Sequence, residues 1–502
     1  MDNIVRLVIR SSIYDLAKQT PINYAVNLSK NLNNKILLKR EDLQSVFSFK
    51  IRGAYNKIKN LSEQEKEKGV ICASAGNHAQ GVALSAKKLS LKATIVMPKT
   101  TPQIKIDAVA RYGASIVLEG DSYTDAYNAC KVLVQETKMT YIPPFDDELV
   151  IAGNATIANE ILMQTSSEVD YIFVPIGGGG LIAGIASFIK NINPQIKVIG
   201  VQPKDSNAMY LSFHAKKKVD IDEVGIFADG VAVKSVGDLT LDLVLKYVDD
   251  IVLVDTDEIC SSIKDIYYDT RNIVEPAGAL AVAGIKHYID EHSISKKTFL
   301  AINSGANMNF DRLSFVADRA LIGEKQEALY VVELEEKPGS FKKFCMDLID
   351  NINVSEFDYR LTNRQKAYVL TGLNINYKQE KDRFLEKAKH LGYNIFDITD
   401  NEIAKSHIRY MIGGKTNLAQ NEVLYHFSFP ERKGALYEFL SKMKSNWNIS
   451  LFHYKHIGTD YGKVLVGFEI PPDEMQDFKE YLKDLRYPFS EETNNLICKI
   501  FL

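Results

Sequence analysis

Lys50 is the residue whose surroundings first point to chemistry. It stands in the stretch SVFSFKIRGAYNKI, residues 45–58, in which apolar residues at 47, 51, 54, 55 and 58 fall on one helical face. Lys50 lies beside that face near the expected helix start, with Ser45 or Ser48 as a candidate N-cap. It is either a structural lysine whose stem packs on the helix and whose ammonium reaches water, or an amine held in a semi-apolar pocket. Burial lowers the pKa of a lysine, and a neutral amine can form a Schiff base.

A glycine tract supplies a second chemical feature. The sequence YIFVPIGGGGLIAGIASFI, residues 171–189, places Gly177, Gly178, Gly179 and Gly180 after an apolar strand and before a helix. Glycine lets the backbone approach an anion closely, and successive N–H groups at the positive end of a helix hold a phosphate. The tract therefore predicts a phosphate cradle, with a tight strand–helix turn as the structural alternative.

Two other phosphate motifs fit the tract less well. Gly178, Gly180 and Ala183 match the GxGxxA pattern of dinucleotide sites, but the next strand ends VIGVQP, with Gln202 where that pattern requires an acid. A Walker loop is excluded because no GK[ST] follows. A cradle for one phosphate and a semi-buried lysine in one domain indicate pyridoxal 5'-phosphate, which carries one phosphate and an aldehyde that an amine can trap.

Three motifs together resemble a known family. SFKIRGAYNKI carries Lys50, ASAGNHAQGVA follows about 25 residues later, and IGGGGL supplies the phosphate loop; FADGVAVKSVGD, VEPAGALAVAG and NSGANMNFDRL also match. The chain resembles the fold-type II pyridoxal-phosphate enzymes of the tryptophan-synthase-β superfamily, and most closely the biosynthetic threonine dehydratases. The resemblance covers nearly the whole chain, because the long members of that family end in two ACT-like regulatory subdomains.

The resemblance implies a role for each matched residue. Lys50 is the Schiff-base lysine and the catalytic base, and Asn77 hydrogen-bonds the 3'-oxygen of the cofactor. Gly177, Gly178, Gly179, Gly180 and Leu181 form the phosphate loop, and Ser304 faces the pyridine nitrogen. His78 is expected to be structural. Ala75 stands where serine racemases carry a catalytic serine, so racemisation is expected to be weak.

The resemblance also implies an activity. It is the elimination of water from L-threonine, giving 2-oxobutanoate and ammonia in the first committed step of isoleucine biosynthesis, with L-serine as a further substrate. Isoleucine is implied as inhibitor, valine as activator, and a homotetramer as the assembly. A serine dehydratase or a threonine synthase of the same superfamily remains the alternative, as does a non-catalytic amino-acid sensor.

Alternating strands and helices are expected to position these residues. Strands are predicted at Ile36–Leu38, Val70–Ala73, Ala93–Met97, Ser115–Leu118, Tyr171–Pro175, Val198–Val201 and Thr298–Ile302, and helices at Ala79–Leu89, Gln103–Tyr112 and Tyr123–Gln135. This βαβ rhythm predicts an α/β catalytic domain with parallel sheets covered by helices. Ligands in such sheets bind beyond the carboxyl ends of the strands, where the motifs at 74–78, 177–180 and 304–307 lie.

Beyond Gly323 the chain repeats itself at an offset of 95 residues. LYVVELEEKPGSFKKF at 329–344 aligns with LYHFSFPERKGALYEF at 424–439, and NVSEFDYR at 353–360 aligns with NISLFHYK at 448–455. Gly339 and Gly434 share the expected turn. We expect a catalytic domain at 1–325 and two α+β ACT-like subdomains at 328–400 and 422–502. They serve either chain association or sensing of a small molecule.

Composition narrows the class of protein. A net charge of −3 and 46% hydrophobic residues are ordinary for a globular enzyme and give no indication of nucleic-acid or membrane binding. No apolar run approaches the roughly 20 residues that span a bilayer. Five scattered cysteines, without a CxxC pair, fit a reducing cytoplasm. Whether a metal ion binds is left open.

Overall fold

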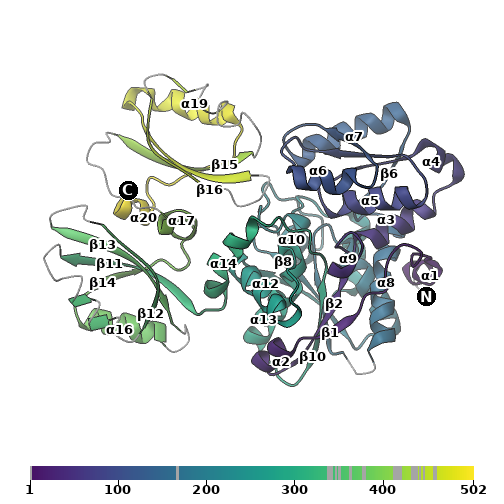
Figure 1. Cartoon of the computed structure of the whole chain (residues 1–502), viewed down its shortest axis with the longest axis horizontal. Helices are drawn as coiled ribbons and strands as arrows, with labels where there is room; N and C mark the ends of the chain where they lie inside the picture. The colour runs from purple at the N-terminus through teal and green to yellow at the C-terminus, as the bar shows by residue number, and fades with distance from the viewer. Residues whose placement is uncertain are drawn as a thin grey trace. The chain divides into compact units, whose positions relative to one another are not determined.

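The chain is seen in a computed structural model. It describes residues 3–165, 169–335, 343–344, 347–348, 352–360, 365–375, 380–410, 421–430, 439, 443–444, 447–455 and 461–502, the side chains of 353–360, 367 and 448–455 excepted. The fold divides into two compact units, Met1–Ala320 and Leu321–Leu502, each of which is described by itself (Figure 1).

A six-stranded sheet forms the centre of the first unit. Its strand order is β1-β2-β10-β7-β8-β9, and all neighbours are parallel except β1 and β2. The strands are β1 (Ile22–Tyr24), β2 (Lys35–Arg40), β7 (Tyr171–Pro175), β8 (Lys197–Pro203), β9 (Asp250–Val254) and β10 (Thr298–Asn303). Parallel strands read as continuous apolar runs because helices cover both of their faces.

Strand β7 shows how those two faces are covered. Ile172 and Val174 belong to the core cluster that includes residues of α8 (Glu148–Gln164), α9 (Gly180–Ile192) and α11 (Asp238–Tyr247). Phe173 points the other way, and its ring centroid lies 5.5 Å from that of Tyr288 on α13 (Pro276–His292). The alternation of side chains along a strand thus places helices on opposite sides of the sheet.

A smaller, fully parallel sheet completes the first unit. Its order is β5-β4-β3-β6, from β3 (Val70–Ala73), β4 (Ala93–Met97), β5 (Ser115–Leu118) and β6 (Thr140–Tyr141). Val70 and Cys72 pack in one cluster with α5 (Asn77–Lys88), whereas Ile71 packs in another with α7 (Tyr123–Thr137). The expected helix-covered parallel sheets are therefore confirmed.

The second unit contains two antiparallel sheets of the same design. Their orders are β12-β13-β11-β14 and β16-β17-β15-β18. The strands are β11 (Glu327–Glu335), β12 (Asn353–Arg360), β13 (Lys366–Asn374), β14 (Asn394–Asp397), β15 (Glu422–Pro430), β16 (Asn448–Lys455), β17 (Tyr461–Glu469) and β18 (Phe489–Glu491), with helices α16 (Asp382–His390) and α19 (Met475–Leu485).

The repeat extends to the pairing register. Strands β15, β16 and β17 each follow β11, β12 and β13 by 95 positions. A register shift occurs between Val354 and Glu356 in one module and between Ile449 and Leu451 in the other. The two expected turn glycines, Gly339 and Gly434, lie outside the described residues. A duplicated α+β module therefore makes up the second unit.

The remaining helical segments are α1 (Asn3–Arg10), α2 (Val26–Leu32), η1 (Glu41–Leu43), α3 (Lys50–Lys59), α4 (Glu63–Lys68), α6 (Gln103–Ala110), α10 (Ala208–Ala215), η2 (Asp229–Val231), α12 (Thr256–Thr270), α14 (Arg312–Gly323), α17 (Glu402–Ser406), η5 (Ile408–Tyr410), η6 (Pro472–Glu474) and α20 (Leu496–Phe501). To cross a bilayer, a helix would have to be longer and more apolar than any in the described part of the chain.

One local prediction is wrong. Helix α3 begins at Lys50 and is preceded by Phe49, so neither Ser45 nor Ser48 caps it with a side chain. Phe47 lies before the helix with φ of +54° and is 47% exposed, so it does not belong to the buried helical face. The segment is held as a loop because the Ala306 N–H donates to the Phe47 carbonyl at 2.8 Å, a long-range contact that local periodicity does not reveal.

Candidate active site

The candidate site lies at the carboxyl ends of strands from both sheets. Strand β3 ends at Ala73, β7 at Pro175 and β10 at Asn303, and each is followed by one of the predicted loops. Strands β7 and β10 are parallel neighbours, so their following loops lie at the same sheet edge. A β-type bridge between Ser48 and Gly305 attaches the segment before Lys50 to the loop after β10.

Lys50 has the surroundings that a reactive amine requires. Its Nζ donates to the Pro144 carbonyl at 2.9 Å and lies 5.3 Å from the centroid of the Phe49 ring. Burial lowers the pKa of Lys50 to about 8, although the charge of Glu275 acts in the opposite direction. A substantial fraction of the amine is therefore neutral slightly above neutral pH, and a neutral amine can act as a nucleophile or a base.

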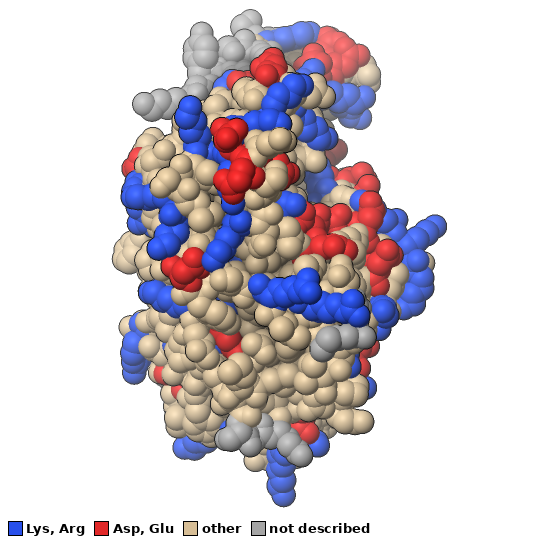
Figure 2. Space-filling view, turned by 90° about the vertical axis from the view of Figure 1, so that its right-hand side faces the viewer, with Lys and Arg blue, Asp and Glu red and all other residues tan. Residues whose placement is uncertain are grey.

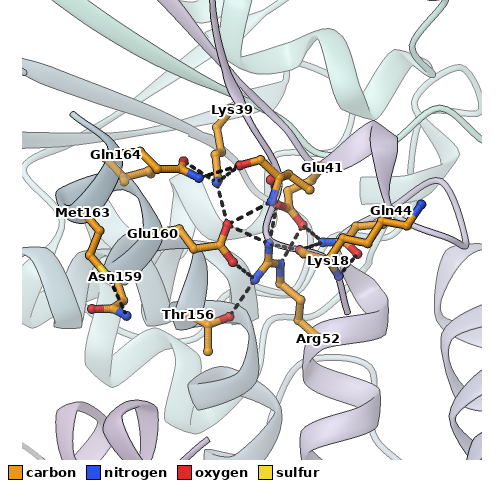
Figure 3. A network of polar contacts seen from close by, with 12 residues as sticks. Lys18, Lys39, Glu41, Gln44, Arg52, Thr156, Asn159, Glu160, Met163 and Gln164 are labelled. Atoms are coloured by element: carbon orange, nitrogen blue, oxygen red, sulfur yellow. Dashed lines mark hydrogen bonds and ion pairs between the residues drawn. The ribbon is translucent and has the colours of Figure 1, made fainter. Parts of the chain in front are cut away.

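A buried ionic network anchors the helix that carries Lys50 (Figure 3). The Arg52 guanidinium contacts Glu41 of η1 at 2.7 Å and Glu160 of α8 at 2.6 Å, and Lys39 of β2 contacts Glu160 at 2.6 Å. All four side chains are at most 1% exposed. Burial alone would raise the pKa of Glu41, but Arg52 outweighs it and holds that pKa below its ordinary value.

This network makes a shift of the Lys50 backbone energetically unfavourable. Arg52 follows Lys50 by two residues, so α3 is attached at its first turn to η1 and α8, and through Glu160 to Lys39 of β2. Removing one partner of a buried ion pair leaves a charge without compensation, which costs about 3–5 kcal/mol. The network therefore fixes the backbone from which the Lys50 side chain projects.

The glycine loop lies against the segment that Lys50 contacts. A Cβ atom added to Gly178 would come within 2.3 Å of the Phe145 ring, and one added to Gly180 within 2.8 Å of the Phe145 Cβ. Gly179, with φ of +97°, precedes helix α9. The N–H groups of the first helical turn have no intrahelical acceptor and lie at the positive end of the helix dipole. The loop thus offers backbone donors for an anion, without side chains.

Asn77 lies in a partly buried hydrogen-bond network, and Ser304 in a buried one. Asn77, the first residue of α5, donates through Nδ2 to Glu275 Oε1 at 2.6 Å. Its Oδ1 accepts from Asn307 Nδ2 at 2.5 Å. Ser304 donates through Oγ to the Ala277 carbonyl at 3.2 Å, and its own carbonyl accepts from the Phe49 N–H at 3.1 Å. Residues far apart in sequence are therefore joined around Lys50.

The donor set of the site fits pyridoxal phosphate. The loop at 177–181 has the chemistry to hold a phosphate dianion, Lys50 is an amine for an aldehyde, and Asn77 has an N–H for an anionic oxygen. A Cβ atom added to Gly76 would meet no atom within 4 Å, so the loop before Asn77 borders open space. His78 Nε2 donates to the Ile142 carbonyl at 2.9 Å, and burial lowers the pKa of His78 to about 3, which agrees with a neutral structural histidine.

The sequence motifs assign no role to Glu275 or Phe145. Glu275 is buried, and burial together with the nearby charge of Asp229 raises its pKa to about 7. The only local signal is one acid in the apolar run NIVEPAGALAVAG, directly before a proline that begins α13. Phe145 gives no signal of its own, because its importance comes from packing on a distant loop.

The surface carries no strong charge pattern on the side that is shown. On the face in Figure 2, acidic and basic side chains are interspersed, and the lower part of the view carries few charges of either sign. Such a distribution does not favour binding to a polyanion on that face. Among the residues the structure describes, no three His, Cys, Asp or Glu side chains form a group that could hold a metal ion.

Family comparisons agree with the division of the chain. Residues 13–305 match the family model of pyridoxal-phosphate dependent enzymes, and residues 318–408 and 414–502 match the C-terminal regulatory domain of threonine dehydratase. The L-threonine dehydratase biosynthetic IlvA of Burkholderia multivorans is 48% identical over 501 residues, which cover 99% of each chain. The mitochondrial threonine dehydratase of Saccharomyces cerevisiae is 46% identical, over 99% of this chain and 89% of the relative.

Solved structures extend the comparison to the fold. The processed form of threonine deaminase isoform 2 from Solanum lycopersicum is 47% identical, with a TM-score of 0.62, over 63% of this chain and 92% of that chain. The serine racemase of maize is 33% identical, with a TM-score of 0.58, over 64% of this chain and 97% of that chain. The chain therefore belongs to the biosynthetic threonine dehydratases: it is a pyridoxal-phosphate dependent enzyme that carries the family's C-terminal regulatory domain.

Proposed function

We propose that the chain converts L-threonine to 2-oxobutanoate and ammonia, and that it also accepts L-serine. The supporting observation is the Lys50 amine, which lies beside the segment that packs on the glycine loop and whose pKa is lowered by burial to about 8, so that a larger share of it is neutral than of an ordinary lysine. Curated relatives that align over nearly the whole chain are named biosynthetic threonine dehydratases.

The proposed site consists of Lys50, Asn77, Ser304 and the loop Gly177, Gly178, Gly179, Gly180 and Leu181. When bound, pyridoxal phosphate supplies an aldehyde for an amine and a ring that delocalises the electrons left by a removed proton. Lys50 would provide the covalent attachment and move the proton of the substrate α-carbon. The glycine loop would bind the phosphate through its N–H groups, Asn77 would donate to the 3'-oxygen, and Ser304 would contact the ring nitrogen.

We further propose that the catalytic domain spans 1–325 and that ACT-like subdomains at 328–400 and 422–502 regulate it. Isoleucine acts as inhibitor and valine as its antagonist, so the subdomains must bind these amino acids unequally in two states of the enzyme. Support comes from the duplicated sheet with its matched register shifts and from the match to a regulatory domain. A coupling of about 1–3 kcal/mol would shift apparent affinity roughly 5- to 150-fold.

The proposed assembly is a homotetramer in the cytoplasm. Cys72, Cys130 and Cys498 are free thiols and, like Cys260, are buried, which suits a reducing compartment, whereas Cys345 lies outside the described residues. Sedimentation of the holoenzyme measures the assembly directly, and a stable monomer or dimer would contradict it.

The function is tested with the purified full chain loaded with pyridoxal phosphate. Formation of 2-oxo acid is followed with L-threonine, L-serine and D-threonine, each with and without isoleucine or valine. We expect turnover of the L-substrates and inhibition by isoleucine that valine relieves. Hydrogen exchange locates the effector, and we expect protection in β11–β18. No 2-oxo acid from L-threonine would exclude the activity, and protection confined to residues 1–320 would exclude the regulatory role of the second unit.

A further inference from the structure

Glu275 is a buried carboxylate that joins three loops of the site. It accepts from Asn77 Nδ2 at 2.6 Å, and its own N–H donates to the Gly305 carbonyl at 3.1 Å. A Cβ atom added to Gly305 would lie 2.3 Å from Glu275 Oε1. Glycine at 305 therefore leaves the space in which the carboxylate reaches Asn77.

The same contacts fix which way the Asn77 amide points. Asn307 Nδ2 donates both to Asn77 Oδ1, at 2.5 Å, and to the Val46 carbonyl, at 2.8 Å. A backbone carbonyl only accepts, so this nitrogen must be the donor, and Asn77 must present its oxygen to it. The Asn77 nitrogen then faces Glu275. One of its two hydrogens is used there, and the second remains to serve a ligand.

Charges from several elements surround the carboxyl group. Asp229 of η2 disfavours its ionisation, whereas Lys105 of α6 and Arg312 of α14 favour it. Lys50 of α3 also interacts with Glu275. Burial is the largest influence, and the resulting pKa is about 7. In both protonation states the carboxyl group keeps an oxygen that can accept from Asn77.

We propose that Glu275 is a positioning residue that holds the Asn77 amide with an N–H, and not its oxygen, available to an anionic oxygen of the bound cofactor. The inference rests on the proposed function, because it takes Asn77 as the partner of the 3'-oxygen. It adds a residue that acts through Asn77 without touching the cofactor. A carboxylate is suited to this role since it accepts hydrogen bonds and, when ionised, cannot donate one that would let the amide turn.

The test measures the dissociation constant of pyridoxal phosphate by fluorescence titration of the full-length apoenzyme. Glu275→Met removes the acceptor and should weaken binding roughly 10- to 100-fold, which is the range for a hydrogen bond to a charged group. Glu275→Gln keeps an acceptor oxygen and should change binding by less than about threefold. Asp170→Asn, at the opposite end of β7, is the matched carboxylate-to-amide control and should leave binding unchanged.

A double-mutant cycle separates this role from a structural one. In an Asn77→Ala background, Glu275→Met should have almost no further effect, because the group through which Glu275 acts is gone. Additive effects of the two substitutions would overturn the inference while leaving the proposed function intact. A wild-type chain that does not bind pyridoxal phosphate would overturn both.

A second variant covers the case in which Glu275→Met does not fold. Glu275→Leu also lacks an acceptor for the Asn77 amide, and in the same titration it should weaken binding of pyridoxal phosphate roughly 10- to 100-fold. Wild-type affinity in a folded Glu275→Leu or Glu275→Met chain would overturn the inference.

Discussion

The two units of the chain treat buried charge in different ways. The first unit buries Lys39, Glu41, Arg52 and Glu160 in one network, and it buries Glu275 where its charge acts on Lys50. In the second unit, the clusters between sheet and helix consist of aliphatic and aromatic residues in both modules, and the buried acid Glu327 lies 3.5 Å from Arg409. In the first unit, parallel sheets that are buried on both faces bring charged loops together at one edge. In each antiparallel module, the sheet and its helix mainly enclose an apolar core.

This difference determines which substitutions each unit tolerates. A charge network tolerates little substitution, because each partner compensates another in a medium of low dielectric constant. An apolar core tolerates changes of side chain if its volume is kept. The two modules show that one strand register accommodates apolar side chains of different size, since Val332 and Leu334 of one correspond to Phe427 and Phe429 of the other.

Lys50→Ala should have the largest effect of the substitutions considered. It should abolish the chemistry of the first unit without affecting the second unit. Turnover of L-threonine should fall at least about a thousandfold, since both the covalent attachment and the base are lost. Isoleucine binding to the folded chain, measured by calorimetry, should persist. Lys59→Ala, at the exposed end of the same helix, is the control and should keep near wild-type turnover. Near wild-type turnover by Lys50→Ala would show that another residue carries the chemistry.

Arg52→Leu should lower the free energy of unfolding of the first unit and leave that of the second unit unchanged. Loss of the guanidinium leaves Glu41 and Glu160 without their buried partner, and we expect a loss of about 3–5 kcal/mol. Urea unfolding measures the total, and hydrogen exchange should show faster opening of α3 and α8 with unchanged protection of β13 and β17. Arg10→Leu, on an exposed position, should change stability by less than about 0.5 kcal/mol. Equal loss of protection in both units would refute the separation.

Mild acid should weaken the second unit before the first. Burial lowers the pKa of His426 to about 4, so its contribution to stability is present above pH 6.5 and is lost as pH falls towards 4. In the first unit, the lowered pKa of His78 also reduces stability in acid. Glu275 has the opposite effect: its pKa is raised to about 7, so the unit becomes more stable as pH falls from 7 to 4.5. The two effects oppose each other there.

Exchange protection measured between pH 7 and 4.5 tests this difference. We expect β15 and β17 to lose about 1–2 kcal/mol while β2 and β10 change less. His426→Gln should flatten the profile of the second unit. A profile that is unchanged by this substitution would mean that another group controls the acid response.

Thr371→Val should give the smallest effect, and a favourable one. The Thr371 hydroxyl is buried without a hydrogen-bond partner in the described structure, and the equivalent position of the other module is Val466. Removing an unsatisfied hydroxyl should stabilise the first module by about 1 kcal/mol, and Val466→Thr should cost about 1–2 kcal/mol. Thermal unfolding measures both. Destabilisation by Thr371→Val would show that the hydroxyl has a use, such as contact with an effector.

The sequence predicts those strands whose formation is determined by neighbouring residues in the chain. Strands β3, β4 and β7 are predicted with their bounds, because a strand buried on both faces is a continuous apolar run. Strand β5 is also predicted with its bounds, although it lies at the edge of its sheet and is exposed at both ends. Strands β1, β6 and β9 escape prediction, since β1 and β6 are very short and β9 begins with an acid. The repeat of the module can be found without knowledge of the fold, because identical residues recur at a fixed offset.

The site is predictable only where a residue type is itself diagnostic. Four successive glycines before a helix predict an anion site from the sequence, with a tight strand–helix turn as the alternative. Glu275 does not, because its importance depends on the fold bringing it to Asn77, 198 positions away. Periodicity assigns Phe47 to a helix, whereas contacts with residues near 305 hold it in a loop.

The attachment of the Lys50 loop to residues 304–307 has a consequence for biosynthesis. Asn307 Nδ2 bonds the Val46 carbonyl across 261 positions, and β2 lies in the sheet beside β10. Contacts of such high sequence separation form late, since the intervening chain must first be ordered. Synthesis proceeds from the N-terminus, so a nascent chain holds its lysine loop unsupported until some 260 further residues have left the ribosome. The cofactor thus meets a finished site only when nearly all of the first unit has been translated.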